Sequence, residues 1–350
     1  MKVIQPDMLK KIWERKLKKD WRGKDLFNIY IDSPFCYAPG CKFCIYKPTI
    51  IDSPKVNKLK DEYYAQVLPQ QIDKFGNLLQ IRKPDTAYFG GGTSSLMSIK
   101  QMTKIFEKLQ QYTDFRGIKE KHFEFNPLSA TDDKIDLMIK WGFTHMTFGF
   151  QTFNQDVLRY NGRVNVKPEK MKMIFEKLEK KGLSYNIDFV GFIYKDDLEE
   201  DMEILRRDLE FVEELNPQRI TLFPNYKKIS GRPKIESKPK IEKMREVVRE
   251  FVARGMFYDE ANMMLKKIDD DNLLANHTFI RKGIADNVWG KIYNSSSPWN
   301  HTRPRDQNVL AFGGWGIRKP YSYIGDTFWY QTVIDESGIK YELRKADIFY

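Results

Sequence analysis

Cysteine is scarce in this sequence, and the few cysteines are confined to one short segment. The chain has 350 residues and only three cysteines, all of which fall between positions 36 and 44. An odd number of cysteines in so short a window argues against a disulfide framework, which pairs cysteines in even numbers across a fold. A shared role at one site is the interpretation that this spacing favours.

Long apolar runs are also missing. No stretch approaches the roughly 20 uncharged apolar residues that a membrane-spanning helix needs. The basic N-terminus has neither the apolar core nor the small-residue cleavage site of a secretion signal. Hydrophobic residues make up 41% and aromatic residues 14% of the chain, which excludes a disordered composition. We expect a cytoplasmic protein with a full hydrophobic core and no membrane partner.

The net charge of +11 is compatible with an anionic partner. Lys and Glu are nevertheless interleaved on predicted helices such as residues 171–182, as they are on solvated helix faces. No block of Lys or Arg is longer than three residues, and no arrangement resembles a nucleic-acid-binding module. We therefore do not expect nucleic acid as a partner.

Apolar runs alternate with amphipathic segments along the first two thirds of the chain. Strands are predicted at residues 27–32, 85–89, 121–125, 144–150, 184–190 and 218–223. Helical patterns lie between them, near residues 55–75, 98–113, 131–141, 154–160 with 167–181, and 197–214. Six βα units of this kind predict an α/β fold with parallel strands, as an open sheet or a complete or partial barrel.

The amino-acid composition changes after the sixth predicted strand. Residues 227–240 combine proline, glycine and many lysines, which is typical of an exposed connection. A helical stretch follows near 240–254, and residues 283–330 are rich in Gly, Trp and Asn, which suggests short strands and turns. The predicted domains are an N-terminal helical segment at 1–26, a βα unit at 27–232 and a smaller C-terminal domain at 233–350.

The cysteine segment has the spacing of a metal site. Cys36, Cys41 and Cys44 are separated by four and two residues, with a proline and a glycine that let the chain fold back. A structural zinc ion wants four protein ligands, and the nearest histidine in the sequence is the distant His122. Three thiolates on an iron–sulfur cubane leave one iron open to a substrate. The residues favour the cluster over zinc, and over plain buried cysteines.

This loop follows a strand directly and has an aromatic residue, Phe43, just before its last cysteine. In both respects it resembles the cluster loop of the radical S-adenosylmethionine (SAM) superfamily, although that pattern usually has three residues between the first two cysteines. The resemblance implies a partial (β/α)6 barrel of the radical SAM type, with a smaller C-terminal α+β domain. The six βα units above agree with that fold.

Further segments resemble the oxygen-independent coproporphyrinogen oxidase-like branch, in the same order along the chain. Asp32 stands in the first of them, where a histidine is usual. The matching segments are Tyr30–Cys36, Phe89–Thr93, Glu124–Pro127, Gly149–Phe153 with Arg163, Asn186–Asp188 with Gly191, and a degraded Gly-rich turn at Ala311–Gly316.

The resemblance implies roles for residues at the strand ends. The glycine segment would receive the SAM ammonium on its carbonyls, and Glu124 would bind the ammonium or a ribose hydroxyl. Arg163 would hold the SAM carboxylate, while Gln151 and Asp188 would hold ribose hydroxyls. The implied cofactor contacts are Tyr30, Phe43, Gly90, Gly91, Gly92, Thr93, Glu124, Gln151, Arg163 and Asp188.

Aromatic residues are frequent near the C-terminus. They are predicted to form either a pocket for a flat substrate or the core of the smaller domain, and the core is favoured. These residues are Trp299, Trp315, Tyr321, Tyr323, Trp329 and Tyr330.

The function implied is that of a radical SAM enzyme. An external one-electron donor such as flavodoxin or ferredoxin would reduce the [4Fe–4S] cluster, and SAM would be cleaved to a 5′-deoxyadenosyl radical that takes hydrogen from a small organic or natural-product substrate. We expect one or two SAM molecules, and methyl transfer or ring formation as the outcome. The alternatives are oxidative decarboxylation of a tetrapyrrole and a non-catalytic haem-delivery protein.

Overall fold

The structure is a computed structural model. It describes residues 3–19, 26–44, 46–164, 168–195, 197–229, 232–235, 238–259, 277–281, 307–315, 320–324 and 328–344. Within these ranges, no helix combines the length and the apolar character that crossing a membrane requires.

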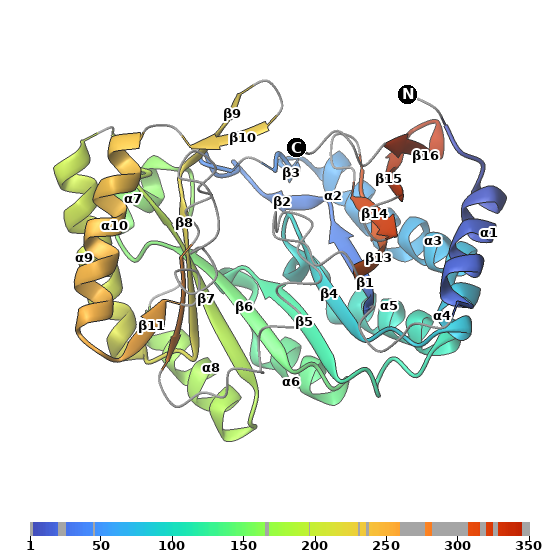
Figure 1. The fold of residues 1–350 in the computed structure, drawn as a ribbon, viewed down its shortest axis with the longest axis horizontal. Coiled ribbons are helices and arrows are strands. Elements are labelled where there is room, and N and C mark those ends of the chain that lie inside the picture. The colour runs from blue at the N-terminus through green and yellow to red at the C-terminus, as the bar shows by residue number, and fades with distance from the viewer. Residues whose placement is uncertain are drawn as a thin grey trace.

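Six parallel strands form the centre of one curved sheet, and they lie side by side in chain order (Figure 1). Each predicted strand is confirmed to within about two residues, because β-branched and aromatic residues cluster there between turn-forming segments. The strands are β1 (Leu26–Ser33), β4 (Thr86–Gly91), β5 (Glu120–Phe125), β6 (His145–Gln151), β7 (Ser184–Gly191) and β8 (Arg219–Pro224).

The crossover helices lie along the outside of this curve (Figure 1). They are α2 (Pro54–Glu62), a π-helical turn (Tyr63–Val67), α3 (Leu68–Phe75), α4 (Asn77–Ile81), α5 (Ile99–Tyr112), α6 (Asp132–Lys140), α7 (Gln155–Tyr160), α8 (Pro168–Lys180) and α9 (Leu198–Leu215). Ser98 and Gln101 form a reciprocal capping box at the start of α5, and Asn216 ends α9 in a left-handed conformation. The predicted helices are therefore present between the predicted strands.

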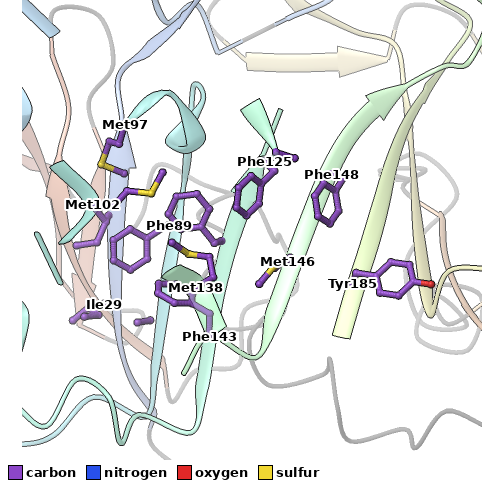
Figure 2. Packing of buried hydrophobic residues seen from close by; sticks show 14 of the residues in the cluster. Ile29, Phe89, Met97, Met102, Phe125, Met138, Phe143, Met146, Phe148 and Tyr185 are labelled. Carbon is purple, nitrogen blue, oxygen red and sulfur yellow. The ribbon is translucent and has the colours of Figure 1, made fainter. Parts of the chain in front are cut away.

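The outer face of the sheet packs against these helices. Successive side chains on a strand point to opposite faces, so alternate positions face outward. Phe89, Phe125 and Phe148 do so on three neighbouring strands, and Figure 2 shows them in one buried cluster with Met102 of α5 and Met138 of α6. Phe89 is fully buried, and its ring lies 5.7 Å from that of Phe123 and 5.4 Å from that of Phe106 on α5.

The later part of the chain extends the same sheet at both edges. At one edge β13 (Gln307–Gly313) pairs in parallel with β1 and is followed by antiparallel β14 (Tyr321–Ile324), β15 (Phe328–Asp335) and β16 (Gly338–Arg344). At the other edge β12 (His277–Arg281) pairs with β8, and β11 (Phe257–Asp259) with β12. The domain boundary at residue 232 stays a prediction, but strands beyond it share the sheet of the βα unit.

Two helices cover the ends of this arrangement. α10 (Lys238–Ala253) packs against α9, and α1 (Pro6–Leu17) packs against α4. Trp13 of α1 is fully buried, and its Nε1 donates a hydrogen bond to the Tyr330 hydroxyl 3.0 Å away. The N-terminal segment therefore rests on the C-terminal strands.

Two small two-stranded units complete the fold. β2 (Phe35–Tyr37) pairs with β3 (Thr49–Ile51), which encloses the cysteine segment. β9 (Tyr226–Ile229) and β10 (Arg232–Ile235) form an antiparallel pair where the composition suggests only an exposed connection. The intervening Ser-Gly of the sequence is a two-residue hairpin signal that the lysines and prolines around it obscure.

Candidate functional site

The carboxyl ends of the parallel strands form one rim of the sheet. Active sites of βα barrels gather at this rim because the loops after the strands converge there. The predicted residues on these ends come from five neighbouring strands: Tyr30 on β1, Gly90 and Gly91 on β4, Glu124 on β5, Gln151 on β6 and Asp188 on β7.

The three cysteines lie in the loop that leaves β1. Each is partly exposed and none is in a disulfide. Burial is the main cause that raises the pKa of the Cys36 and Cys44 thiols, and the nearby Cys41 sulfur raises both further. The thiols are therefore close enough to disfavour each other's charge, which a bound cationic centre would reverse.

Two residues from other parts of the chain reach the sulfur atoms. The Thr93 Oγ1 lies 3.0 Å from the Cys36 Sγ, and the Arg163 Nη1 lies 3.4 Å from the Cys41 Sγ. Arg163 also donates through Nη2 to the Gly149 carbonyl at the end of β6. Its buried Nε has no hydrogen-bond partner within the described ranges, so the guanidinium keeps a donor for an anionic group. The structure thus brings Thr93 and Arg163 to the cysteine loop.

The glycine segment fits the end of β4 against the cysteine loop. The Gly92 amide donates to the Ser33 carbonyl at 2.6 Å, and the Thr93 amide donates to the Phe35 carbonyl at 2.9 Å. A Cβ on Gly92 would lie 2.5 Å from the Phe35 carbonyl oxygen, so no side chain fits there. Gly91 has φ +111°, which disfavours any residue with a Cβ. These glycines are needed for loop packing, and their contact with an ammonium stays a prediction.

Two carboxyl groups, Glu124 on β5 and Asp188 on β7, lie close enough to interact electrostatically. The Tyr88 hydroxyl donates a hydrogen bond to the Glu124 Oε1, and the Asn186 Nδ2 donates to the Asp188 Oδ1 at 2.6 Å. Burial is the main cause that raises the pKa of Asp188 to about 7, and the charge of Glu124 contributes to that rise. The pair can accept hydrogen bonds from a cation or from hydroxyls, and a protonated Asp188 can also donate one.

Gln151 has a conformation that its residue type rarely adopts. Its φ is +73°, and β6 has an irregular register between Gly149 and Gln151. A left-handed conformation at a residue other than glycine costs about 1 to 3 kcal/mol and is concentrated at functional sites. The strained backbone turns β6 at the rim, beside the carbonyl that Arg163 binds.

For two further predicted cofactor contacts, Tyr30 and Phe43, the structure shows contacts within the protein. Tyr30 is 5% exposed, and its hydroxyl donates to the Asp32 Oδ1 at 3.3 Å. Phe43 packs against Val157, Ile193 and Tyr194, on the side of the loop that faces α7. The cofactor contacts of Tyr30 and Phe43 stay predictions.

Sequence reasoning missed several polar residues below the rim. His122 Nε2 lies 2.7 Å from the Thr147 Oγ1, and the Thr221 Oγ1 donates to the Asn186 Oδ1 at 3.1 Å. Burial lowers the pKa of His122 well below its ordinary value, so this imidazole is neutral. With Tyr88, these residues occupy alternate positions of their strands, on the inner face. A polar residue at every second position of four consecutive buried strands was the signal that could have revealed them.

The aromatic residues of the C-terminal strands pack in cores. Tyr323 and Trp329 join Tyr30 and Tyr88 in one cluster on the inner face, and Tyr330 lies in the main core. Trp315 packs against the main core, with its ring 6.3 Å from that of Tyr63. Trp299 lies outside the described residues. Packing therefore accounts for the described members of this set.

The site has the side chains that both implied cofactors require. Three thiols and a guanidinium suit a cluster, which carries negative charge and takes one thiolate on each of three irons. No three His, Cys, Asp or Glu side chains in the described ranges are grouped as ligands of a single metal ion. The acidic pair and the free Arg163 Nε suit a ligand with an ammonium, hydroxyls and a carboxylate, which are the polar groups of SAM.

Comparison with known families agrees with this donor set. The model of the Radical SAM superfamily matches residues 30–207, about half of the chain, including all three cysteines. The chain belongs to the radical SAM superfamily. Membership implies a [4Fe–4S] cluster and SAM as cofactors, and the residues at the rim fit both.

Curated radical SAM relatives narrow the branch. The chain is 26% identical over 197 residues to the heme chaperone HemW of Haemophilus influenzae, covering 56% of this chain and 50% of that protein. It is 27% identical over 199 residues to the oxygen-independent coproporphyrinogen III oxidase of Escherichia coli, covering 57% and 41%. The chain thus spans about half the length of the curated relatives it matches, and the coproporphyrinogen oxidase-like branch is confirmed.

A solved structure confirms the fold. The structure of coproporphyrinogen III oxidase (HemN) from Escherichia coli, a radical SAM enzyme, superposes with a TM-score of 0.69 at 19% identity. The superposition covers 92% of this chain and 70% of the other. The predicted α/β fold of the radical SAM type is therefore confirmed, with additional strands from the C-terminal region.

Proposed function

We propose that this chain is an enzyme that cleaves SAM reductively and uses the resulting 5′-deoxyadenosyl radical to take hydrogen from a small organic substrate. One observation carries the proposal. Arg163 contacts both the Cys41 sulfur and the Gly149 carbonyl, at the rim where Glu124, Gln151 and Asp188 lie at or near the ends of their strands. The ligands of the implied cluster and the groups suited to SAM thus form one site.

The proposed roles follow from chemistry and position. Cys36, Cys41 and Cys44 hold the cluster, which when bound supplies one electron to the SAM sulfonium. Arg163 binds the methionine carboxylate with a charge-assisted hydrogen bond and offsets the negative charge of the thiolates. Glu124, held by Tyr88, binds the ammonium or a ribose hydroxyl. Asp188 binds ribose hydroxyls in either protonation state, as acceptor or donor.

The buried rim supports radical chemistry in a second way. The inner face of the sheet carries Tyr30, Tyr88 and Trp329 in an aromatic cluster beside the acidic pair. Such a wall excludes solvent and the oxygen dissolved in it, and oxygen would otherwise trap a reactive carbon radical. The protein therefore supplies position, charge and exclusion of solvent, while the cofactors supply the chemistry.

The candidate functions differ in the substrate. Methyl transfer or ring formation with a second SAM rests on the sequence resemblance alone. Oxidative decarboxylation of a tetrapyrrole is the second candidate, and it is favoured by the coproporphyrinogen III oxidase relatives. Haem delivery is favoured by the relatives named heme chaperone, which match about the same share of this chain.

Anaerobic reconstitution with iron and sulfide, followed by incubation with SAM and dithionite, tests the proposal. We expect stoichiometric methionine and 5′-deoxyadenosine, and S-adenosylhomocysteine in addition if methyl transfer occurs. Incubation with coproporphyrinogen III and mass detection of carbon dioxide loss tests the tetrapyrrole candidate. A protein that binds haem tightly and yields no 5′-deoxyadenosine would be a delivery protein, and the proposed activity would then be wrong.

A further inference from the structure

Two exposed lysines, one exposed tyrosine and one buried tyrosine form a continuous array beside the cysteine loop. The Lys42 Nζ lies 4.2 Å from the centre of the Tyr160 ring, and the Lys195 Nζ lies 4.4 Å from the centre of the Tyr194 ring. The two rings meet edge to face, with centroids 5.3 Å apart. We call these four residues the tyrosine–lysine array. Cation–π contacts hold each ammonium in place at the surface, although each remains accessible to solvent.

The array is attached to the cysteine loop by several contacts. Lys42 directly follows Cys41, and its amide donates to the Asn161 carbonyl at 3.1 Å. The Asn161 Nδ2 in turn donates to the Ile193 carbonyl at 2.9 Å, next to Tyr194. Phe43 packs beneath, against Ile193 and Tyr194. The position of the array relative to the proposed cluster ligands is therefore set by the fold and does not depend on long flexible side chains.

The chemistry of the array is that of a binding surface for an acidic protein. Lys42 and Lys195 are exposed, and Tyr160 exposes 41% of its surface between them. Lys42 forms no ion pair with any described residue, whereas Asp156 is paired with Arg159 and, with Glu200, lies near Lys195. Exposed tyrosine is one of the residue types enriched in interface hot spots, and lysines around it attract an acidic partner.

The sequence around the cysteines adds to the positive charge. Residues 33–50 contain Lys42 and Lys47 and no Asp or Glu. Lys47 is exposed, and its backbone amide and that of Tyr46 are bound by the Cys44 sulfur. Two exposed lysines thus lie on the loop itself, where a partner that exchanges electrons with a cluster would approach.

We propose that the tyrosine–lysine array docks an acidic one-electron carrier protein, for which flavodoxin is the probe. The proposal rests on the proposed function, because it gives the [4Fe–4S] site its reductant. In the step concerned, the reduced carrier loses one electron and the cluster gains it, and no covalent bond changes. The array steers the carrier by charge and holds it by stacking contacts on Tyr160.

The test compares charge variants with two different reductants. Lys42→Glu, Lys42→Gln and Lys195→Glu are reconstituted anaerobically, and their affinity for flavodoxin is measured by titration calorimetry at low and physiological salt. Reduction of the cluster is then followed by its absorbance, first with reduced flavodoxin and then with dithionite. We expect Lys42→Glu to weaken flavodoxin binding and slow reduction by flavodoxin about tenfold, with a smaller effect for Lys42→Gln and a loss of salt dependence.

Dithionite separates docking from the site itself. It needs no protein surface, so the variants should be reduced by dithionite at the wild-type rate. Lys119→Glu is the matched control, because Lys119 is exposed and lies just before β5, at the end of the sheet opposite the loop. It should change flavodoxin binding by less than about twofold, since it is remote from the array.

Three results would overturn the proposal. Unchanged flavodoxin affinity in Lys42→Glu would remove the docking role, and so would equal slowing with both reductants. If Lys42→Glu lost the ability to bind tRNA but still bound flavodoxin normally, the array would be a nucleic-acid-binding surface. Failure of the proposed function is distinct from these, since it would appear as wild-type protein that binds flavodoxin normally and yields no 5′-deoxyadenosine with dithionite.

Discussion

The two faces of the central sheet use alternate residues of the same strands for opposite purposes. On β4, Phe89 points outward into a fully apolar core, and Tyr88 beside it points inward to Glu124. On β7, Ile187 lies in the outer core, and Asp188 is half-buried on the inner face. The outer face stabilises the fold by removing apolar surface from water, whereas the inner face buries polar groups at a cost that hydrogen bonds only partly offset.

This difference indicates which changes affect stability and which affect chemistry. A substitution on the outer face should unfold the protein while leaving the site's chemistry unaltered in the folded fraction. A substitution at the rim should alter the site's chemistry, and should change stability only through the hydrogen bonds and charges that it removes. Four experiments test this division, in order of decreasing expected effect.

The largest effect is expected at the cysteine loop. Cys41→Ala should abolish the brown cluster and the formation of 5′-deoxyadenosine, because an iron then lacks its thiolate. The unfolding free energy of the metal-free protein should change by less than about 1 kcal/mol, since Cys41 is partly exposed. Iron content, absorbance and urea unfolding give these values. Unchanged iron content would disprove the ligand assignment.

The outer face should show the largest effect on stability. Phe89→Ala removes a fully buried ring and should lower the unfolding free energy by about 3 to 5 kcal/mol. Thr221→Val is the matched change on the inner face, where it removes one hydrogen bond to Asn186 and should cost about 1 kcal/mol. Urea unfolding of the metal-free proteins measures both. If the two substitutions lowered the unfolding free energy equally, the outer face would not be the main source of stability.

Asp188 should make stability depend on pH. Burial raises its pKa to about 7 in the folded protein, against about 3.9 when unfolded. Between pH 4 and 7 the unfolded state has released this proton and the folded state has not. The contribution of Asp188 to stability is therefore greatest below pH 4 and is lost as the pH rises to 7.

Asp188→Asn should remove this part of the slope, on the order of 3 kcal/mol between pH 4 and 7. Unfolding by urea at a series of pH values measures it. Asp208, whose pKa burial also raises to about 7, contributes equally to both proteins and cancels in the difference. Parallel curves for wild type and Asp188→Asn would mean that Asp188 titrates normally in the folded state.

The smallest effect is expected at Glu124. Glu124→Gln keeps the shape but removes the charge that attracts an ammonium, so the KM for SAM should rise about tenfold, equivalent to about 1.4 kcal/mol. Tyr88→Phe, which removes only the hydrogen bond to Glu124, should raise it less. Steady-state kinetics with dithionite gives the values. A fall in kcat at constant KM would move Glu124 from binding to the chemical step.

Much of the fold was predictable because its signals are local. Each strand is a short apolar run between turn-forming residues, and each helix has an apolar stripe, so both can be found without knowledge of neighbours. The pairing of β13 with β1 was not predictable, since Gln307 and Leu26 are distant in sequence. No periodic pattern encodes which edge of a sheet a late strand will join.

The candidate site was predictable to a similar extent. The spacing of the cysteines and the resemblance of the motifs predicted a cysteine loop and several further residues, and the fold brings these to one end of the sheet. The partners of those residues were not apparent. Tyr88 is an ordinary strand residue by composition, and only the fold brings its hydroxyl to Glu124.

The sequence by itself determined the βα alternation and the grouping of three thiols, because both are set by residue type and short spacing. Only the tertiary structure decided that Arg163 meets Cys41 across 122 positions, and that the half-buried Asp188 lies near a second carboxylate. It also decided that Lys42 and Lys195 belong to one surface. Desolvation and charge–charge coupling depend on which groups surround a side chain, and the folded chain alone sets those surroundings.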